Sequence, residues 1–119
     1  MIKIKRLLKS FIYAGKGLQR TFVEEQNFKI QILLAVVAIA LGFLFKISNL
    51  EWCVLIFTIS LVLLMELANS AVERVTDILK PRIHDYVKEI KDIMAATVFL
   101  ASLVAIIIGL IIFLPYIIK

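Results

Sequence analysis

Side chains that could do chemistry gather on one predicted helix face in the second half of the chain. They are Glu66, Asn69, Ser70, Glu73 and Asp77. Their spacing, i, i+3, i+4, i+7 and i+11, places all five on the same side of a helix. An ionisable side chain within a membrane span costs roughly 2.5–3.5 kcal/mol on insertion scales, so it seldom persists without a use. We expect these carboxylates to face a water-filled site, a cation or a partner chain.

The stretch that leads to this face has the composition of a membrane helix. Residues 52–65 are uncharged and mostly apolar. The chain of 119 residues is 62% hydrophobic, and its mean hydropathy is +1.01. These values exclude a soluble globular domain of this size and predict an integral membrane protein.

Three apolar blocks predict an all-α fold with three transmembrane helices, at about 30–46, 52–72 and 93–114. Residues 73–92 join the second and third spans. The length suits a single membrane domain that comprises residues 1–119.

Lysine and arginine are distributed unevenly about these spans. Seven of the fourteen precede the first span, five lie between the second and third spans, and only Lys46 and Lys119 fall on the other side. The positive-inside rule therefore predicts that the N-terminus and residues 73–92 are cytoplasmic. The formal net charge of +5 describes a cytoplasmic face suited to anionic lipid or phosphate ligands.

Residues 1–27 alternate basic and apolar side chains with helical period, which predicts an amphipathic helix in the headgroup layer. One polar stripe of this helix contains Arg6, Lys9, Tyr13, Lys16, Arg20 and Glu24. The stripe either lies solvated on the membrane surface or contacts a nucleotide or a lipid headgroup. Gly15 and Gly17 each weaken a helix by about 1 kcal/mol relative to Ala, so we expect a bend or a close approach there.

Glu24 and Glu25 are adjacent acids just before the first span. They either belong to a solvated helix face, or at least one of them turns toward a cation held by Glu73. The sequence contains none of the motifs of soluble nucleotide-binding or zinc enzymes, such as GxxxxGK[ST], GxGxxG, HExxH or a Cys/His cluster.

Two stretches resemble the signatures of a known family. Residues 66–73, ELANSAVE, look like the E-x-x-N-[ST]-A-[IV]-E signature of the prokaryotic diacylglycerol kinase/undecaprenol kinase family. Residues 91–98, KDIMAATV, are similar to its second signature, a Lys-Asp pair followed by small residues and Val. The Lys16-Gly17-Leu18 triplet and Glu25 also fall where the family has them. The resemblance covers nearly the whole chain and agrees with the predicted number and orientation of the spans.

The resemblance implies a homotrimeric bundle of three-span subunits in the bacterial cell membrane, each with an amphipathic N-terminal helix. It also implies an enzyme that transfers the γ-phosphate of Mg-ATP to the primary hydroxyl of a membrane lipid alcohol. The implied partners are the lipid alcohol, ATP with Mg²⁺, and other copies of the same chain, with no nucleic acid.

Functional roles carry over residue by residue onto the matching positions. Glu66 would be the general base and would contact the lipid, with Ala95 near the lipid headgroup. Glu25 and Glu73 would hold Mg²⁺ together with the ATP phosphates, and Asn69 would orient the reacting groups. The further nucleotide contacts would be Arg6, Tyr13, Arg82, Ile83, His84, Lys91 and Asp92. Because Glu66 precedes Glu73 by seven residues, it would lie about 10 Å deeper, at the level of a lipid hydroxyl.

Some positions depart from the family's pattern. Met94 and Thr97 stand where Gly or Ala is usual, which narrows the entrance for the lipid. Gln31 and Gly15 stand where the enteric diacylglycerol kinases carry Glu and Trp. The Glu51-Trp52 start of the second span is more like the Gram-positive branch, whose substrate is usually undecaprenol. We therefore expect undecaprenol as the main substrate, with diacylglycerol as the alternative.

A non-enzymatic alternative is a small oligomeric channel or a phage holin. Length, charge and span count fit that class equally well. A channel or a holin, however, does not need carboxylates at i and i+7 together with a Lys-Asp pair at the start of the next span.

Overall fold

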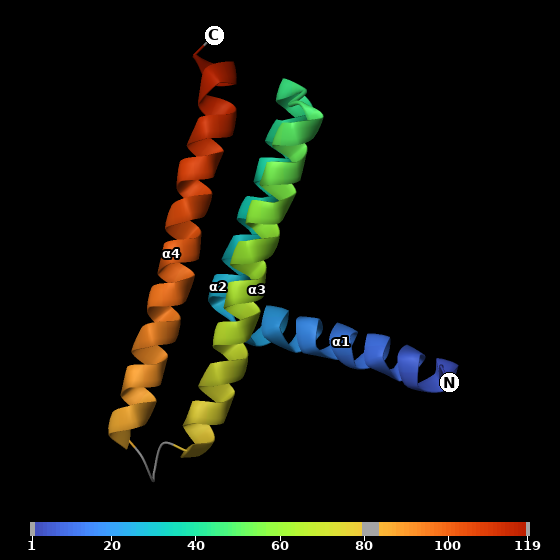
Figure 1. Ribbon diagram of the computed structural model, residues 1–119, viewed down its shortest axis with the longest axis vertical. Helices are drawn as coiled ribbons and strands as arrows, with labels where there is room; N and C mark the ends of the chain where they lie inside the picture. Colours follow the sequence, from blue (N-terminus) through green and yellow to red (C-terminus); the bar gives the residue numbers. More distant parts are fainter. Residues whose placement is uncertain (1, 80–83, 119) are drawn as a thin grey trace.

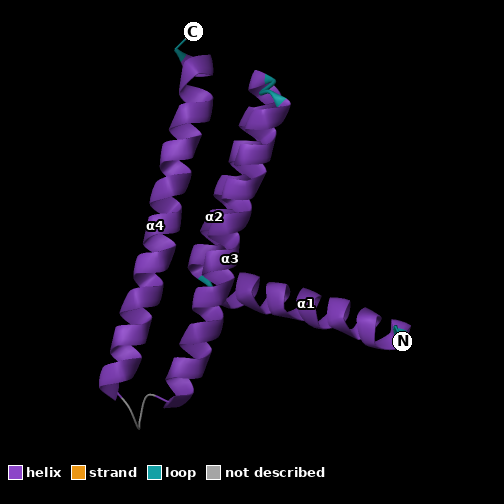
Figure 2. Cartoon of the chain, viewed as in Figure 1, coloured by secondary structure: helices purple, strands orange, loops and turns teal. Residues whose placement is uncertain are grey.

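The computed structural model describes residues 2–79 and 84–118, and in these residues all regular structure is helical (Figure 2). The four helices are α1 (Ile4–Glu24), α2 (Gln26–Phe45), α3 (Asn49–Leu79) and α4 (His84–Ile117). The last three run side by side, whereas α1 leaves the bundle at a steep angle (Figure 1). Within the described part of the chain, α2, α3 and α4 are each long and apolar enough to cross a membrane. The expected all-α membrane fold, with three spans and an additional N-terminal helix, is confirmed.

The bend between α1 and α2 falls at Glu25. Its backbone is extended, with φ −105° and ψ 113°, so it interrupts the helical path between the two elements. The prediction of a bend or a close approach at Gly15 and Gly17 was wrong. Helix α1 runs through both glycines, and a Cβ added to either would meet nothing within 4 Å. A propensity loss of about 1 kcal/mol per glycine does not break a helix whose other residues favour it.

The turn between α2 and α3 lies at the opposite end of α2 from Glu25. Lys46 ends α2 in the left-handed conformation, with φ 53°. Ser48 and Glu51 then form a capping box, in which the Ser48 amide donates to Glu51 Oε1 (3.0 Å) and the Glu51 amide donates to Ser48 Oγ (3.2 Å). Glu51 Oε1 also accepts a hydrogen bond from the Tyr116 hydroxyl at 2.5 Å. These contacts tie the first turn of α3 to the last turns of α4.

A cluster of buried apolar side chains packs at this same end of the bundle. Its buried members are Ile47, Leu55, Ile112 and Phe113. Trp52 covers the backbone of α2 at Gly42 so closely that a Cβ there would lie 2.7 Å from the Trp52 ring. The remaining outward-facing apolar side chains match a helix bundle surrounded by lipid rather than water.

The lengths of the helices place the polar face of α3 at a membrane boundary. From Asn49 to Ser70 a helix rises about 32 Å, which is close to the roughly 30 Å hydrocarbon core of a bilayer. Glu25 contacts α3 at Ser70, so α1 leaves the bundle at that same level. An amphipathic helix that starts at this depth and turns sideways would lie along the membrane surface.

Candidate active site

The acidic face of α3 meets Glu25 at the start of α2. Glu66 is only 5% exposed and interacts electrostatically with both Glu25 and Glu73. Gln31 from α2 lies beside Glu66, and its side-chain amide donates to Ser102 Oγ of α4 at 3.5 Å. The spacing on α3 and the position of Glu25 therefore bring three predicted site carboxylates into one cluster.

Two neutral side chains of α3 fix the carboxylates beside Glu66. Ser70 is 2% exposed, and its Oγ donates to Glu25 Oε1 over 3.2 Å. Asn69 Nδ2 donates to Glu73 Oε1 over 3.4 Å. Asn69 was predicted to orient reacting groups, and in this structure it orients a carboxylate. These two contacts hold Glu25 and Glu73 on the same side of α3 as Glu66.

Arg74 closes the junction between α1 and α3. Its guanidinium donates to the Ser70 carbonyl oxygen at 3.3 Å and also contacts Ser70 Oγ. The same group forms an ion pair with Glu24. The two adjacent acids of the junction are thus used differently: Glu25 turns to the acidic face, and Glu24 neutralises Arg74.

Sequence reasoning placed Ser70 on the polar face of α3 but gave it no role of its own, and it did not identify Arg74 as a site residue. A signal was available, because Arg74 follows Ser70 by four residues, the spacing at which helical side chains meet. Their partners on the α1–α2 junction could not be recognised, since they lie 45 and 50 positions away in the chain.

Lys91 of α4 joins the edge of the site. Its Nζ forms a 2.7 Å ion pair with Asp77 Oδ1, and it also interacts electrostatically with Glu73. Asp92 and Ala95 lie exposed on the same helix. Lys91 is therefore the one predicted nucleotide contact on α4 that the described structure links to the acidic cluster.

Other predicted contacts lie apart from the cluster or outside the described residues. Arg6 and Tyr13 are exposed on α1, and Arg6 precedes Glu25 by nineteen residues, or about 28 Å of helix. Arg82 and Ile83 lie outside the described residues, and His84 is the first residue of α4. The roles of these residues stay predictions.

The carboxylate oxygens of the cluster suit a Mg²⁺ ion that is shared with a nucleotide, rather than one that protein side chains bind alone. Among the described residues, no group of three or more His, Cys, Asp or Glu side chains is arranged to hold a metal by itself. Glu25 and Glu73 nevertheless each interact electrostatically with Glu66. Mg²⁺ prefers oxygen ligands, keeps several waters and is often bound by one or two carboxylates plus substrate phosphates. The two carboxylates therefore fit a magnesium–nucleotide complex.

The fold and the site together define a small helical membrane protein with an acidic cluster at the end of its second span. The sequence profile of prokaryotic diacylglycerol kinase matches residues 12–113. The chain therefore belongs to the prokaryotic diacylglycerol kinase family, which the sequence signatures predicted.

Curated relatives carry two different substrate names. An undecaprenol kinase of Bacillus subtilis is 34% identical over 113 residues, which are 95% of this chain and 92% of that protein. A diacylglycerol kinase of Synechocystis is 36% identical over 110 residues, 92% of this chain and 63% of that protein. The Escherichia coli diacylglycerol kinase is 28% identical over 102 residues, 86% of this chain and 84% of that protein. Membership places the chain among prokaryotic lipid kinases, with ATP as co-substrate.

Proposed function

We propose that this protein transfers the γ-phosphate of Mg-ATP to the primary hydroxyl of a membrane lipid alcohol, with undecaprenol preferred over diacylglycerol. The observation that carries the proposal is the burial of Glu66 beside Glu25 and Glu73. This arrangement lies about one membrane thickness from the start of α3, where a lipid hydroxyl and a nucleotide can meet.

In this mechanism Glu66 accepts the proton of the lipid hydroxyl as that oxygen attacks the γ-phosphate. Phosphoryl transfer depends mainly on positioning and on neutralising charge. Glu25 and Glu73 would hold Mg²⁺, which when bound offsets the negative charge of the polyphosphate. Asn69 and Ser70 keep these two carboxylates in place through the hydrogen bonds described above.

The nucleotide would approach from the side of Lys91. The ammonium group of Lys91, which is paired with Asp77 in this structure, can exchange that carboxylate for a phosphate oxygen. Asp92, and the segment 82–84, would complete the nucleotide contacts, while Ala95 would lie near the lipid headgroup. These assignments follow the signatures of the family.

The choice of undecaprenol is a proposal about substrate preference. Support comes from the similarity to the Bacillus subtilis undecaprenol kinase over 95% of this chain and from the Glu51-Trp52 start of the second span. The similarity to a diacylglycerol kinase at 36% identity keeps diacylglycerol as the alternative lipid.

We further propose that residues 1–119 form one kinase domain, that the domain assembles as a homotrimer in the bacterial cell membrane, and that its N-terminus and residues 73–92 face the cytoplasm. Cytoplasmic ATP and the excess of basic residues on that side support the orientation. In a trimer, α1 of one chain can lie against the site of its neighbour. That placement would account for the distance of Arg6 from the acidic cluster of its own chain.

The decisive experiment supplies radiolabelled ATP to purified protein in mixed micelles that contain either undecaprenol or diacylglycerol at equal mole fraction. Label in the organic phase with both lipids, and more with undecaprenol, is the expected result. More label with diacylglycerol would reverse the proposed preference. Absence of label with either lipid, together with ion leakage from protein-containing vesicles, would favour the channel instead.

A further inference from the structure

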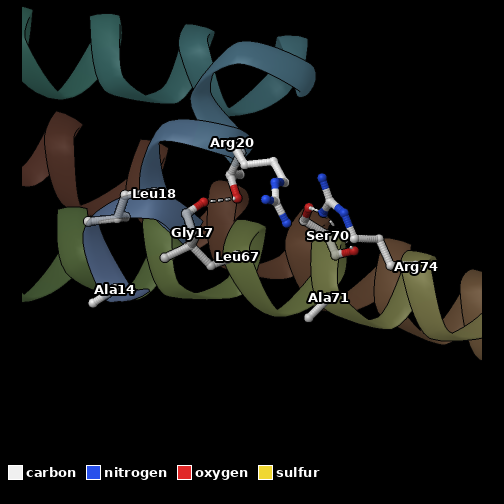
Figure 3. A pocket seen from close by; sticks show the side chains of 9 residues that line it. Ala14, Gly17, Leu18, Arg20, Leu67, Ser70, Ala71 and Arg74 are labelled. Atoms are coloured by element: carbon white, nitrogen blue, oxygen red, sulfur yellow. Dashed lines mark hydrogen bonds between the residues drawn. The ribbon is translucent and has the colours of Figure 1, made fainter. Parts of the chain in front are cut away.

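A cavity of about 540 Å³ lies between α1 and α3, and Ser70 is part of its lining (Figure 3). Most of its wall is apolar. Ala14 and Leu18 of α1 face Leu67 and Ala71 of α3 across it. None of these four residues has a role in the proposed phosphoryl transfer, so the cavity needs its own explanation.

Two arginines are the charged residues in the lining of this cavity, which also contains Thr21 and Ser70. Arg20 comes from α1 and Arg74 from α3, and Figure 3 shows their guanidinium groups turned toward one another. Arg74 is paired with Glu24, whereas Arg20 has no ion pair or hydrogen bond to another side chain among the described residues. The three groups together carry a net positive charge. Glu24 offsets the charge of Arg74, so one net positive charge remains, and it favours an anion in the space that both guanidinium groups face.

The geometry of guanidinium groups favours phosphate as that anion. The planar fork of an arginine donates two parallel hydrogen bonds to a phosphate or carboxylate group. A soluble phosphate compound would gain nothing from the apolar wall formed by Leu18 and Leu67. A membrane lipid would use both parts, with its phosphate at the arginines and the beginning of its chains against the apolar wall.

The depth of the cavity agrees with a lipid ligand. Ser70 lies about 32 Å of helix from the start of α3, which is the level of a membrane boundary. Lipid phosphates lie just outside the hydrocarbon core, and basic side chains at this level attract anionic lipids.

We propose that the cavity between α1 and α3 binds the phosphate group of an anionic membrane lipid, with Arg20 and Arg74 as its ligands. Two sources share this chemistry: a phosphodiester phospholipid of the surrounding bilayer and the lipid phosphomonoester that a lipid kinase produces. Binding at this site does not depend on the phosphoryl transfer proposed above, and it can be measured without turnover.

The test measures lipid binding to the full-length protein in neutral detergent by native mass spectrometry, with phosphatidylglycerol as the probe. Diacylglycerol with the same acyl chains is the neutral comparison, and we expect it to bind at least tenfold more weakly. Arg20→Gln should weaken phosphatidylglycerol binding about tenfold, the factor expected for one lost charge-assisted contact. Arg20→Lys keeps the charge but loses the two parallel donors of the guanidinium group. Its affinity for phosphatidylglycerol should lie between that of the unmodified protein and that of Arg20→Gln.

Lys5→Gln is the matched control, because it removes one positive charge from α1 at an exposed position that lies outside the polar stripe and does not line the cavity. It should change binding less than twofold. Phosphatidic acid bound at least tenfold more tightly than phosphatidylglycerol would identify the lipid product as the ligand, and equal binding would identify the bilayer phospholipid. Either result supports a lipid phosphate site.

Three results would overturn the proposal. They are unchanged binding in Arg20→Gln, equal binding of diacylglycerol, and release of phosphatidylglycerol by a non-hydrolysable ATP analogue, which would assign the arginines to the nucleotide. Glu66→Gln should bind phosphatidylglycerol like the unmodified protein. A protein that shows no kinase activity but binds the lipid through Arg20 would therefore contradict the proposed function alone.

Discussion

Ser70 Oγ donates a 3.2 Å hydrogen bond to Glu25 Oε1, and this contact joins the α1–α2 junction to the acidic face of α3. Glu25 has extended backbone angles, so its side chain is not held in place by a helix. The position of one proposed magnesium ligand thus depends on a hydroxyl group of another helix. Arg74 in turn contacts Ser70, which makes the junction a small connected network.

We predict that Ser70→Ala raises the Mg²⁺ concentration needed for half-maximal kinase activity by about tenfold. The reason is that a hydrogen bond to a charged group contributes about 1.5–3 kcal/mol, and its loss lets Glu25 move. The measurement is a magnesium titration of initial rates. Ser70→Thr keeps the hydroxyl and should restore the original requirement. Ser60→Ala, at an exposed position on the same helix, should have no effect, and an equal shift in that control would refute the assignment.

A second prediction concerns the proposed general base. Glu66→Gln keeps the size and polarity of the side chain but cannot accept the hydroxyl proton. It should lower kcat by a factor of about 10²–10⁴, the usual contribution of a general base, while Mg-ATP binding changes little. Rates in micelles and nucleotide binding by calorimetry would measure the two effects. The control Glu89→Gln alters an exposed glutamate of α4 and should retain activity. Near-normal turnover by Glu66→Gln would exclude this residue as the base.

The sequence was sufficient to predict the spans and the acidic face. Both depend on local patterns: uncharged apolar blocks for α2, α3 and α4, and helical spacing for Glu66, Asn69 and Glu73. The depth of Glu66 also follows from helical rise. These features need no knowledge of how the helices pack.

The contacts between helices could not be predicted in the same way. The rotation of α3 about its axis and the direction in which α1 leaves the bundle decide that Ser70 meets Glu25 and that Arg74 meets Glu24. No turn residue marks the break at Glu25, whereas Gly15 and Gly17 suggested one where none occurs. The pair of Lys91 with Asp77 likewise depends on the packing of α3 against α4.

That pair provides a third prediction, in which two substitutions act in opposite directions. Lys91→Ala should raise the KM for ATP severalfold, because a positive charge near the polyphosphate is lost. Asp77→Asn removes the competing partner of Lys91 and should lower the KM or leave it unchanged. Thermal unfolding should change little in either variant, since exposed ion pairs contribute only about 0–1 kcal/mol. If both substitutions raise the KM equally, the ion pair itself is what matters, and Lys91 does not contact the nucleotide.

The last prediction separates stability from catalysis by using two glycines of the membrane spans. A Cβ at Gly42 would lie 2.7 Å and 3.0 Å from atoms of the Trp52 ring, whereas a Cβ at Gly109 would meet nothing within 4 Å. Gly42→Ala should therefore destabilise the protein by about 1–3 kcal/mol through overpacking, and Gly109→Ala should be neutral or stabilising by up to about 1 kcal/mol through helix propensity. Thermal unfolding in detergent measures both.

Gly42 lies at the end of α2 opposite Glu25, so the kcat of the folded fraction of Gly42→Ala should stay unchanged. Loss of kcat at full stability would mean that packing at Trp52 controls the acidic cluster, which the structure does not predict.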